Sequence, residues 1–456
     1  MKNSLLLGVS RKIITPKVGG NLMGYAPDVY SETVNDDLTV ASYYFKSGDT
    51  VALMISATLC VISSDIAEPF LEEIEKKFSI PKDNIILHTM HTHSGPILCN
   101  IPGWGSADYE YIETIFRPAL MESVEEAISL ATPVTMATAR GETKIGCNRR
   151  QLKPNNTISL GQNPWGPFDP KMTIISFKNE EGKVVANMVH YGAHATASGR
   201  NHEITRDWPG PMIDTLDENL GGITAFFNGP EGDVGPRMPA GTTTGGLIDG
   251  KHISHVRYAL QMGSFAASEA TAISKSMSGY SDADLQVSTK YIDIPLKPRI
   301  SLEEAEAVYE ANKPYTSNLP ARKKAYAEEV IKSYKDGYTD IEKISFRQTI
   351  IRIGDVAFVS FPYELFSEMG LRIARASKIP YTLSLALTNG SEGYFPTEAD
   401  LCRGGYEVDS FKVKYIQPYV DDADFHLVKN TLAHLETLGY DKHPEKAFEF
   451  DENATK

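Results

Sequence analysis

His91-Thr92-His93-Ser94-Gly95-Pro96 is the stretch of sequence on which the interpretation of the whole chain depends. It follows the apolar segment 85–87, which is bounded by polar turn residues and therefore predicts a buried strand. Gly95 and Pro96 then predict a loop. Because side chains alternate along a strand, His91 and His93 are expected to point to the same side. Neutral imidazoles are common ligands of zinc-like metals, but a His-x-His pair alone is more often a pair of hydrogen-bonded loop histidines.

The composition excludes several classes of protein. The 456 residues are enough for one large or two ordinary domains, and 41% hydrophobic with 23% charged residues is typical of a soluble globular protein. A formal net charge of -14 argues against a nucleic-acid partner and against an anionic membrane surface. The four cysteines, Cys60, Cys99, Cys147 and Cys402, form no CxxC or CxxH pair, which argues against a thiolate zinc site and favours a reducing compartment.

The apolar runs of the chain are short. Residues 5–7 are too few for the core of a signal peptide, and residues 51–62 cannot span a bilayer, which needs about 20 residues. We therefore expect a cytoplasmic protein without a transmembrane segment. A leader removed before this numbering, and a homo-oligomer in place of a monomer, are alternatives that the sequence leaves open.

Hydrophobic patterns predict an α/β fold of mixed β-sheet layers flanked by helices. Strand–helix–strand order, first seen over residues 51–87, favours right-handed crossovers. Strands are expected over residues 6–14, 38–45, 51–57, 85–87, 134–140, 172–177, 184–191, 223–227, 287–296, 345–353, 356–361 and 383–387. Helices are expected over residues 64–78, 108–130 with a kink or split at Pro118, 208–216, 252–274, 365–374 and 425–438.

One domain is expected over residues 1–445, followed by a tail over residues 446–456. Within it, residues 297–340 are a candidate helical insertion, with a capping-box pattern at Ser301 and a break near Pro320. These helices could form a lid over a site, but their mixed, regularly spaced charges favour a solvated pair.

Several of the predicted strands are followed by polar or metal-binding side chains. His91 and His194 each follow a strand of the first half of the chain, while Glu364 and Tyr394 follow strands of the second half. This is the pattern expected when functional groups gather at one end of a sheet, although sequence spacing alone does not show that the four meet. His190, four residues before His194, is a rival for the second histidine position.

These residues lie in motifs that resemble those of the neutral/alkaline, non-lysosomal ceramidases. His91-Thr92-His93-Ser94-Gly95-Pro96 looks like the family's HTHSGP signature. Other segments match along much of the chain: Met23-Gly24-Tyr25-Ala26 looks like its MGYA, Cys147-Asn148-Arg149 like its NR motif, residues 189–196 like the strand with its second metal histidine, residues 228–236 like its GDxSP loop, and Phe361-Pro362-Tyr363-Glu364 like its PGE. Tyr394 and Tyr406 match a ligand tyrosine and a site tyrosine at the same spacing of twelve residues.

The resemblance implies a catalytic domain that binds one zinc ion per chain. By resemblance, the metal ligands are His91, His194, Glu364 and Tyr394. His93, Arg149 and Tyr406 would be catalytic residues around the substrate, and the loop with Gly232, Asp233 and Gly235 would bind it.

The implied activity is a zinc-dependent hydrolysis in which metal-activated water attacks the amide bond of a small or lipid-like, amphiphilic N-acyl substrate. In such a reaction His93 would carry a proton to the leaving amine, and Arg149 or Tyr406 would stabilise the negative charge on the carbonyl oxygen.

The chain also departs from the family pattern. The serine of GDxSP is replaced by Gly235, and no C-terminal β-sandwich is expected after the tyrosine pair. These departures keep two alternatives open beside amide hydrolysis: a related metal hydrolase acting on an ester or glycosidic bond, and a non-catalytic metal-containing binding protein.

Overall fold

A computed structural model describes residues 4–237, 247–248, 251–252 and 256–439 of the chain. The predicted C-terminal tail, residues 446–456, and the last residues assigned to the preceding domain lie outside this part. None of the described helices is long and apolar enough to cross a membrane.

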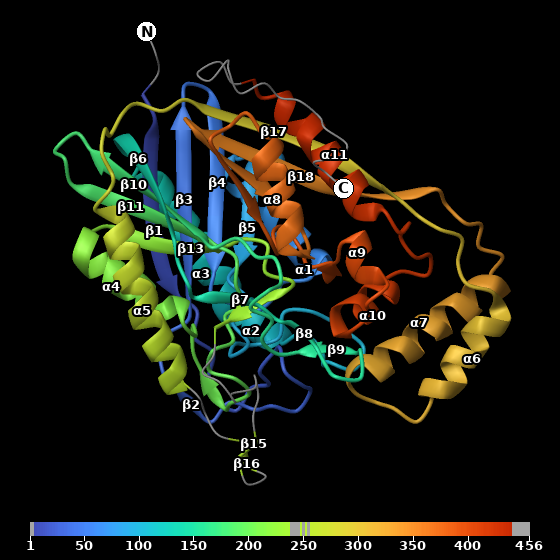
Figure 1. The fold of residues 1–456 in the computed structure, drawn as a ribbon. Coiled ribbons are helices and arrows are strands. Elements are labelled where there is room, and N and C mark those ends of the chain that lie inside the picture. Colours follow the sequence, from blue (N-terminus) through green and yellow to red (C-terminus); the bar gives the residue numbers. More distant parts are fainter. Residues whose placement is uncertain (1–3, 238–246, 249–250, 253–255, 440–456) are drawn as a thin grey trace.

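An eight-stranded mixed sheet forms the first β-layer (Figure 1). Its strand order is β13-β11-β10-β6-β1-β3-β4-β5, and the β4–β5 and β11–β13 pairs are parallel. The strands are β1 (Leu6–Ile13), β3 (Thr39–Ser47), β4 (Thr50–Ala57), β5 (Ile85–Thr89), β6 (Thr132–Glu142), β10 (Lys171–Asn179), β11 (Val184–Tyr191) and β13 (Ile223–Asn228). The predicted strands of the first half of the chain are therefore confirmed.

A four-stranded sheet forms the second β-layer, in the order β17-β18-β19-β21. It is antiparallel except for the β19–β21 pair. Its strands are β17 (Leu285–Pro295), β18 (Lys343–Ile353), β19 (Val356–Ser360) and β21 (Tyr381–Leu385). One apolar cluster joins the facing surfaces of both sheets, with Phe45 and Phe177 from the first and Phe358 and Leu385 from the second. The sheets therefore pack face to face and share one core.

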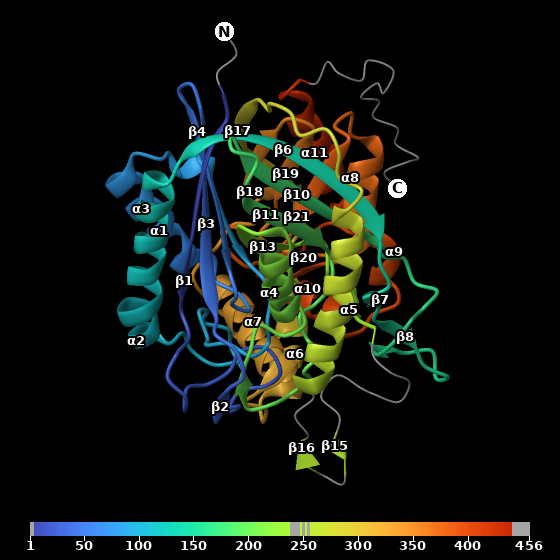
Figure 2. The ribbon, with the colours of Figure 1, turned by 90° about the vertical axis from the view of Figure 1, so that its left-hand side faces the viewer.

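Helices cover the outer faces of both sheets (Figure 2). The first sheet carries α1 (Ser64–Phe78), α3 (Arg117–Ser129), α4 (Pro209–Leu220) and α5 (Val256–Ser274). The second carries α8 (Ser367–Ala376) and α11 (Ala423–Glu436). The predicted fold of mixed sheets flanked by helices is confirmed. The last described strand is β22 (Tyr394–Phe395), so the described residues contain no C-terminal β-sandwich.

The helical stretch from residue 108 runs past Pro118, where a kink or a split was predicted, and is not split there. It begins with α2 (Tyr109–Tyr111), capped by the Asp108 side chain, and continues through a π turn (Ile112–Phe116) into α3. The wider π turn lies directly before Pro118, which lacks a backbone N–H for the α-helical ladder.

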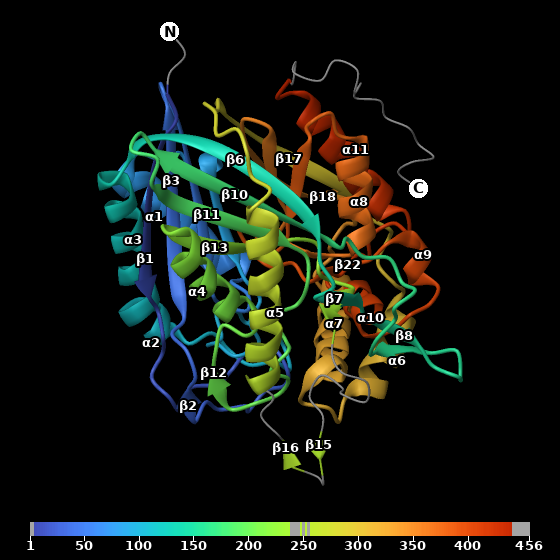
Figure 3. The same cartoon turned by 60° about the vertical axis from the view of Figure 1, so that its left-hand side comes forward.

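Short strand pairs gather loops at one end of the two sheets (Figure 3). The pairs are β2 (Thr33–Val34) with β12 (Glu203–Ile204), β7 (Gly146–Asn148) with β14 (Val234–Pro236), β8 (Arg150–Leu152) with β9 (Ile158–Leu160), β15 (Leu247–Ile248) with β16 (Lys251–His252), and β20 (Glu364–Leu365) with β22. The short helices are η1 (Lys82–Asn84), α9 (Glu398–Leu401) and α10 (Tyr406–Lys412).

The predicted helical insertion is a helix pair, α6 (Leu302–Asn312) and α7 (Asn318–Lys335). The capping box at Ser301 is confirmed. The break predicted near Pro320 was misplaced, because it falls between α6 and α7. Pro320 lies in the first turn of α7, where a helix does not use the proline's missing N–H. The two helices pack on each other through Ala305, Tyr326 and Val330, beside α10 (Figure 1).

We expect Gly8→Ala to lower the free energy of unfolding by about 3 kcal/mol through overpacking. A β-carbon at Gly8 would lie 1.8 Å from the backbone oxygen of Ala127, because α3 packs directly on β1. Urea denaturation measures the change. Gly20→Ala is the control, since its β-carbon would have no neighbour closer than 3.9 Å. Equal stabilities for the two variants would contradict this packing.

Candidate metal centre

His91 lies in the loop after β5 rather than on the strand itself. The strand ends at Thr89, and His91 has a φ of 70°, which non-glycine residues adopt rarely. The expectation that strand alternation orients His91 and His93 was therefore wrong. The two rings nevertheless converge, with 3.2 Å between their Nε2 atoms. The neighbouring Thr92 forms a β-bridge with Ala195, which ties this loop to the loop after β11.

His194 occupies that second loop and is fully buried. Its Nδ1 lies 2.9 Å from the carbonyl oxygen of Glu231 and 3.1 Å from that of Val234. The rival, His190, remains within β11, where its Nε2 lies 2.9 Å from the carbonyl oxygen of Ser384. His194 is therefore the histidine that the structure brings to His91, with 4.6 Å between the ring centroids.

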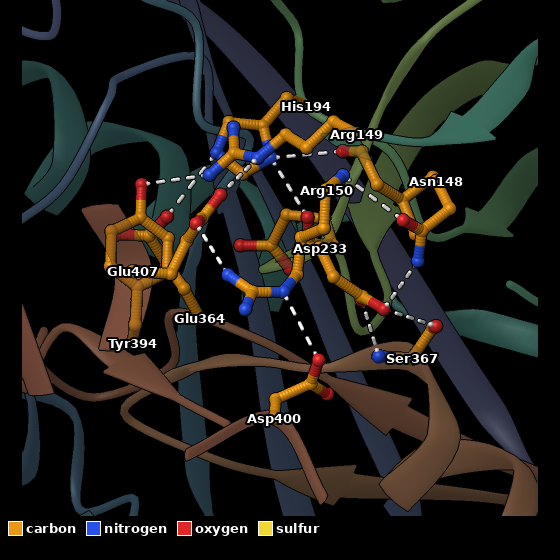
Figure 4. Close-up of polar contacts among 12 residues, drawn as sticks. Asn148, Arg149, Arg150, His194, Asp233, Glu364, Ser367, Tyr394, Asp400 and Glu407 are labelled. Atoms are coloured by element: carbon orange, nitrogen blue, oxygen red, sulfur yellow. Dashed lines mark hydrogen bonds and ion pairs between the residues drawn. The ribbon is translucent and has the colours of Figure 1, made fainter. Parts of the chain in front are cut away.

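Glu364 brings a carboxylate from the second sheet to these two imidazoles. It lies on β20, paired with Tyr394 on β22. Its Oε2 is 3.4 Å from Nε2 of His91. The same oxygen is 3.2 Å from Nε2 of His194 (Figure 4). All three side chains are buried, and their ligand atoms lie within 4.8 Å of one another.

The hydrogen bonds of this trio fit a bound cation. Nδ1 of His91 faces the Cys60 carbonyl oxygen at 3.0 Å, and Nδ1 of His194 faces the two carbonyl oxygens named above. Each Nδ1 must therefore carry a proton, which leaves a lone pair on Nε2 directed at the Glu364 carboxylate. Nε2 of His194 and Oε2 of Glu364 have no hydrogen-bond partner among the described residues.

Protonation of the imidazoles is a poor substitute for a metal ion here. Burial lowers the pKa of His194 to about 3, so the ring is neutral near pH 7. Burial alone would raise the pKa of Glu364, whereas positive charge at His91 and His194 would hold it well below its usual value. A divalent cation between the ligands supplies such charge without protonating the rings. Two lone pairs and an anion in contact favour a divalent cation between them, and two histidines with one glutamate are a zinc-binding set.

Tyr394, the fourth predicted ligand, lies beside Glu364 in the β20–β22 ladder. Its hydroxyl accepts a hydrogen bond from Nη2 of Arg149 at 3.0 Å (Figure 4). Burial and the Glu364 carboxylate raise the pKa of Tyr394 well above its usual value, which favours the neutral phenol. The Tyr406 ring packs against it, with 5.6 Å between centroids. The two tyrosines therefore meet at the centre, and direct ligation by Tyr394 stays a prediction.

Arg149 and Arg150 are both held by acidic side chains. Arg149 bonds through Nε to Glu407 at 3.1 Å, and Arg150 bonds to Glu407 at 2.8 Å and to Asp400 at 3.2 Å (Figure 4). Burial would lower the pKa of Arg149, but Tyr394 and Glu407 raise it above its usual value. Glu407, which Arg150 also binds, therefore fixes the charged guanidinium of Arg149 at the centre.

His93 is held by the MGYA segment. A β-carbon at Gly24 would lie 2.3 Å from Cγ of His93, so only glycine allows this approach. The Tyr25 ring contacts the imidazole edge-on, with 4.9 Å between centroids. Loss of solvent and the neighbouring His91 and His194 lower the pKa of His93 well below its usual value. The neutral ring is therefore the resting form.

The three residues predicted to bind substrate have different surroundings. Gly235 lines a cavity with Arg149. Gly232 packs on the backbone of Glu364, where a β-carbon would meet the carbonyl oxygen at 2.4 Å. Asp233 accepts hydrogen bonds from the Ser367 backbone at 2.6 Å and from Asn148 at 3.0 Å (Figure 4). Gly232 and Asp233 therefore fix the conformation of the 228–236 loop.

Two cavities, of about 420 and about 380 Å³, meet at the centre. His91 and Glu364 line the first, and Arg149 lines the second. Their shared walls are Gly24, His93, Trp104, Tyr394 and Tyr406. The arrangement is a cleft with two arms on either side of the candidate metal position.

Sequence reasoning missed several residues of this site. Glu231 is buried, and its carboxylate has no hydrogen-bond partner among the described residues. Burial and the Glu364 carboxylate raise the pKa of Glu231 well above its usual value, which favours its protonated form. Its position in the 228–236 loop was the only signal. Nothing in the sequence indicated Glu407 or Trp104, because neither lies in a motif and each reaches the site only through tertiary contacts.

Comparisons with known proteins agree with the predicted resemblance. No family model matches the chain. Neutral ceramidase A of Dictyostelium discoideum is 24% identical over 258 residues, which cover 51% of this chain and 36% of that protein. The chain thus spans about a third of that relative's length.

Two solved structures share the fold. Neutral ceramidase from Pseudomonas aeruginosa matches with a TM-score of 0.69 at 16% identity, over 95% of this chain and 74% of that one. A ceramidase complexed with C2 matches with a TM-score of 0.68 at 15% identity, over the same shares. The predicted resemblance to neutral ceramidases is therefore confirmed as a similarity, and at these identities the solved structures establish the fold alone.

We expect His194→Ala to abolish tight binding of one zinc ion per chain, because it removes a buried ligand of the trio. Calorimetric zinc titration of the chelator-treated protein measures the loss. His190→Ala is the matched control, since that histidine is also buried but faces the Ser384 carbonyl oxygen instead. Unchanged zinc affinity in His194→Ala, or equal losses in both variants, would contradict the assignment.

Proposed function

We propose that the chain is a zinc-dependent hydrolase that cleaves an amide bond in a small or amphiphilic N-acyl substrate. The observation that carries this proposal is the convergence of two buried imidazoles and one carboxylate beside the junction of two cavities. The sequence and fold similarity to neutral ceramidases supports it.

His91, His194 and Glu364 would hold the metal, with Tyr394 as a fourth ligand or a neighbouring donor. When bound, zinc polarises a carbonyl oxygen and lowers the pKa of water to about 7. The carbonyls of Cys60, Glu231 and Val234 orient the two histidines for this task.

Arg149 would stabilise the negative charge that develops on the substrate's carbonyl oxygen. Its guanidinium lines the second cavity, carries a full charge and is fixed by Glu407 and Tyr394. Tyr406 would add a hydroxyl donor from the shared wall, because burial raises its pKa and keeps the phenol protonated. Donors held in place before the reaction cost no reorganisation during it.

His93 would move the proton from the attacking water to the leaving amine. Its neutral resting form can accept a proton, and its lowered pKa makes the protonated ring a strong acid toward an amine. Its Nε2 lies at the centre, 3.2 Å from that of His91.

An ester or glycosidic bond is the second candidate, and Gly235 favours it. A β-carbon there would meet Arg149 at 3.7 Å, an ordinary contact, so the cleft has room that a serine would fill. A panel of an N-acyl amide, the matching ester and an aryl glycoside, with products identified by mass spectrometry, separates the candidates. Metal-dependent cleavage of the amide alone supports the first proposal. Zinc binding without turnover of any substrate would favour a binding protein.

We expect Arg149→Gln to lower kcat by about 100- to 1000-fold on the preferred substrate, the range for loss of one oxyanion donor. Zinc affinity should stay within about twofold of the wild type, because Arg149 is not in the ligand trio. Steady-state kinetics and zinc titration measure the two effects. An Arg149→Gln enzyme with unchanged kcat would refute the role.

We expect Tyr406→Phe to lower kcat by a smaller factor, about 10-fold, since one neutral hydroxyl is lost while the ring remains. Tyr415→Phe is the control, because that hydroxyl bonds to Glu392 instead. Equal kinetics of Tyr406→Phe and wild type would show that the Tyr406 hydroxyl plays no part in turnover.

A further inference from the structure

The first arm of the cleft contains an arginine that the proposed chemistry does not use. Arg322, on α7, lines the cavity that also contains His91 and Glu364. A β-carbon at Gly393 would lie 3.6 Å from its Nη2, so the guanidinium lies against the backbone next to Tyr394. It therefore reaches the candidate metal centre from the helical insertion.

Arg322 has no hydrogen bond or ion pair with any described residue. Its neighbour on α7, Lys323, pairs with Asp409 at 2.9 Å. Most arginines of the described part make a hydrogen bond or an ion pair, so an arginine with neither inside a cavity is unusual. Burial lowers the pKa of Arg322, with Tyr406 and Glu364 acting against that shift, and an arginine stays protonated near pH 7.

The acidic side chains around this cavity do not neutralise Arg322. Glu364 faces the two histidines. Glu392 bonds to Lys414 at 2.8 Å, to Tyr415 at 2.7 Å and to Ser64 at 2.5 Å. Asp65 and Glu329 also line the cavity, but they are exposed, where solvent and salt screen their charge.

The second arm differs from the first in its chemistry. Its lining includes Leu160, Pro236, Leu319 and Pro320, with Arg149 at the end next to the metal position. α7 contributes to both arms, through Leu319 and Pro320 in its first turn and through Arg322 in the next. The expectation of a merely solvated helix pair was therefore incomplete, because α7 forms part of the cleft wall.

We propose that Arg322 binds an anionic oxygen group of the substrate, a carboxylate, sulfonate or phosphate, while the other arm holds an apolar part. This inference rests on the proposed function and names its substrate class. The planar guanidinium fork matches such groups with paired hydrogen bonds. The two arms meet at His93, Tyr394 and Tyr406, so the scissile bond lies between the anionic and the apolar parts.

Matched substrates test the charge preference. N-decanoylglycine carries a carboxylate on the amine side of the amide, which N-decanoylethanolamine lacks. The monodecylamide of succinic acid carries a carboxylate on the acyl side, which the decylamide of butyric acid lacks. We expect the wild type to favour the anionic member of at least one pair by about 10- to 100-fold in kcat/KM, the range for a hydrogen bond to a charged group. The pair that shows the preference identifies the side of the bond.

Substitution of the arginine must remove that preference. In Arg322→Gln, kcat/KM for the anionic substrate should fall by about 10- to 100-fold, mainly through KM, and stay within about threefold for the neutral one. Arg322→Lys should recover part of the loss, and Lys323→Gln should behave as wild type. Equal losses for charged and neutral substrates would indicate a merely structural arginine and overturn the proposal.

A binding experiment separates this inference from the proposed function. Calorimetry with N-acetylglycine and N-methylsuccinamic acid, on the zinc-loaded protein, needs no turnover. Binding that Arg322→Gln abolishes supports the anion site even if no amide is cleaved. Turnover of amides without any charge preference, and no binding of either anion to the wild type, would overturn the anion site while leaving the hydrolase intact.

Discussion

The contact of two unprotonated imidazole nitrogens with one ionised carboxylate, all removed from solvent, is the constraint on which the rest of the site depends. Backbone carbonyls fix both histidines in the tautomer that turns Nε2 toward Glu364. Such a cluster is unfavourable unless a cation occupies its middle. Arg149, Tyr394 and Tyr406 then surround a position that these ligands require a cation to fill.

The two packed sheets explain how residues so distant in sequence reach one point. Loops after β5 and β11 of the first sheet carry His91 and His194, and the Thr92–Ala195 bridge holds these loops together. The segments after β19 and β21 of the second sheet form the β20–β22 pair, which carries the carboxylate. The centre therefore lies where the ends of both sheets meet, and a shift between the sheets would open it.

Much of this could be predicted from the sequence, because strand and helix periodicities and the family motifs are local signals. The structure brings together His91, His194 and Glu364, which the resemblance implied as metal ligands. The orientation of His91 was not, because a φ of 70° is imposed by tertiary contacts and leaves no hydrophobic pattern. Arg322 gave no signal either, since it lies in a stretch of mixed charge. Only the packing of α7 beside α10 shows that Arg322 lines the cavity while Lys323 pairs with Asp409.

X-ray absorption spectroscopy at the zinc edge tests the central claim most directly, on the full chain loaded with one equivalent of zinc. Two imidazole nitrogens at about 2.0–2.1 Å, with the remaining neighbours oxygen, are the result this account predicts. A sulfur ligand at about 2.3 Å, from the nearby Cys60, or a spectrum without imidazole scattering, would contradict it.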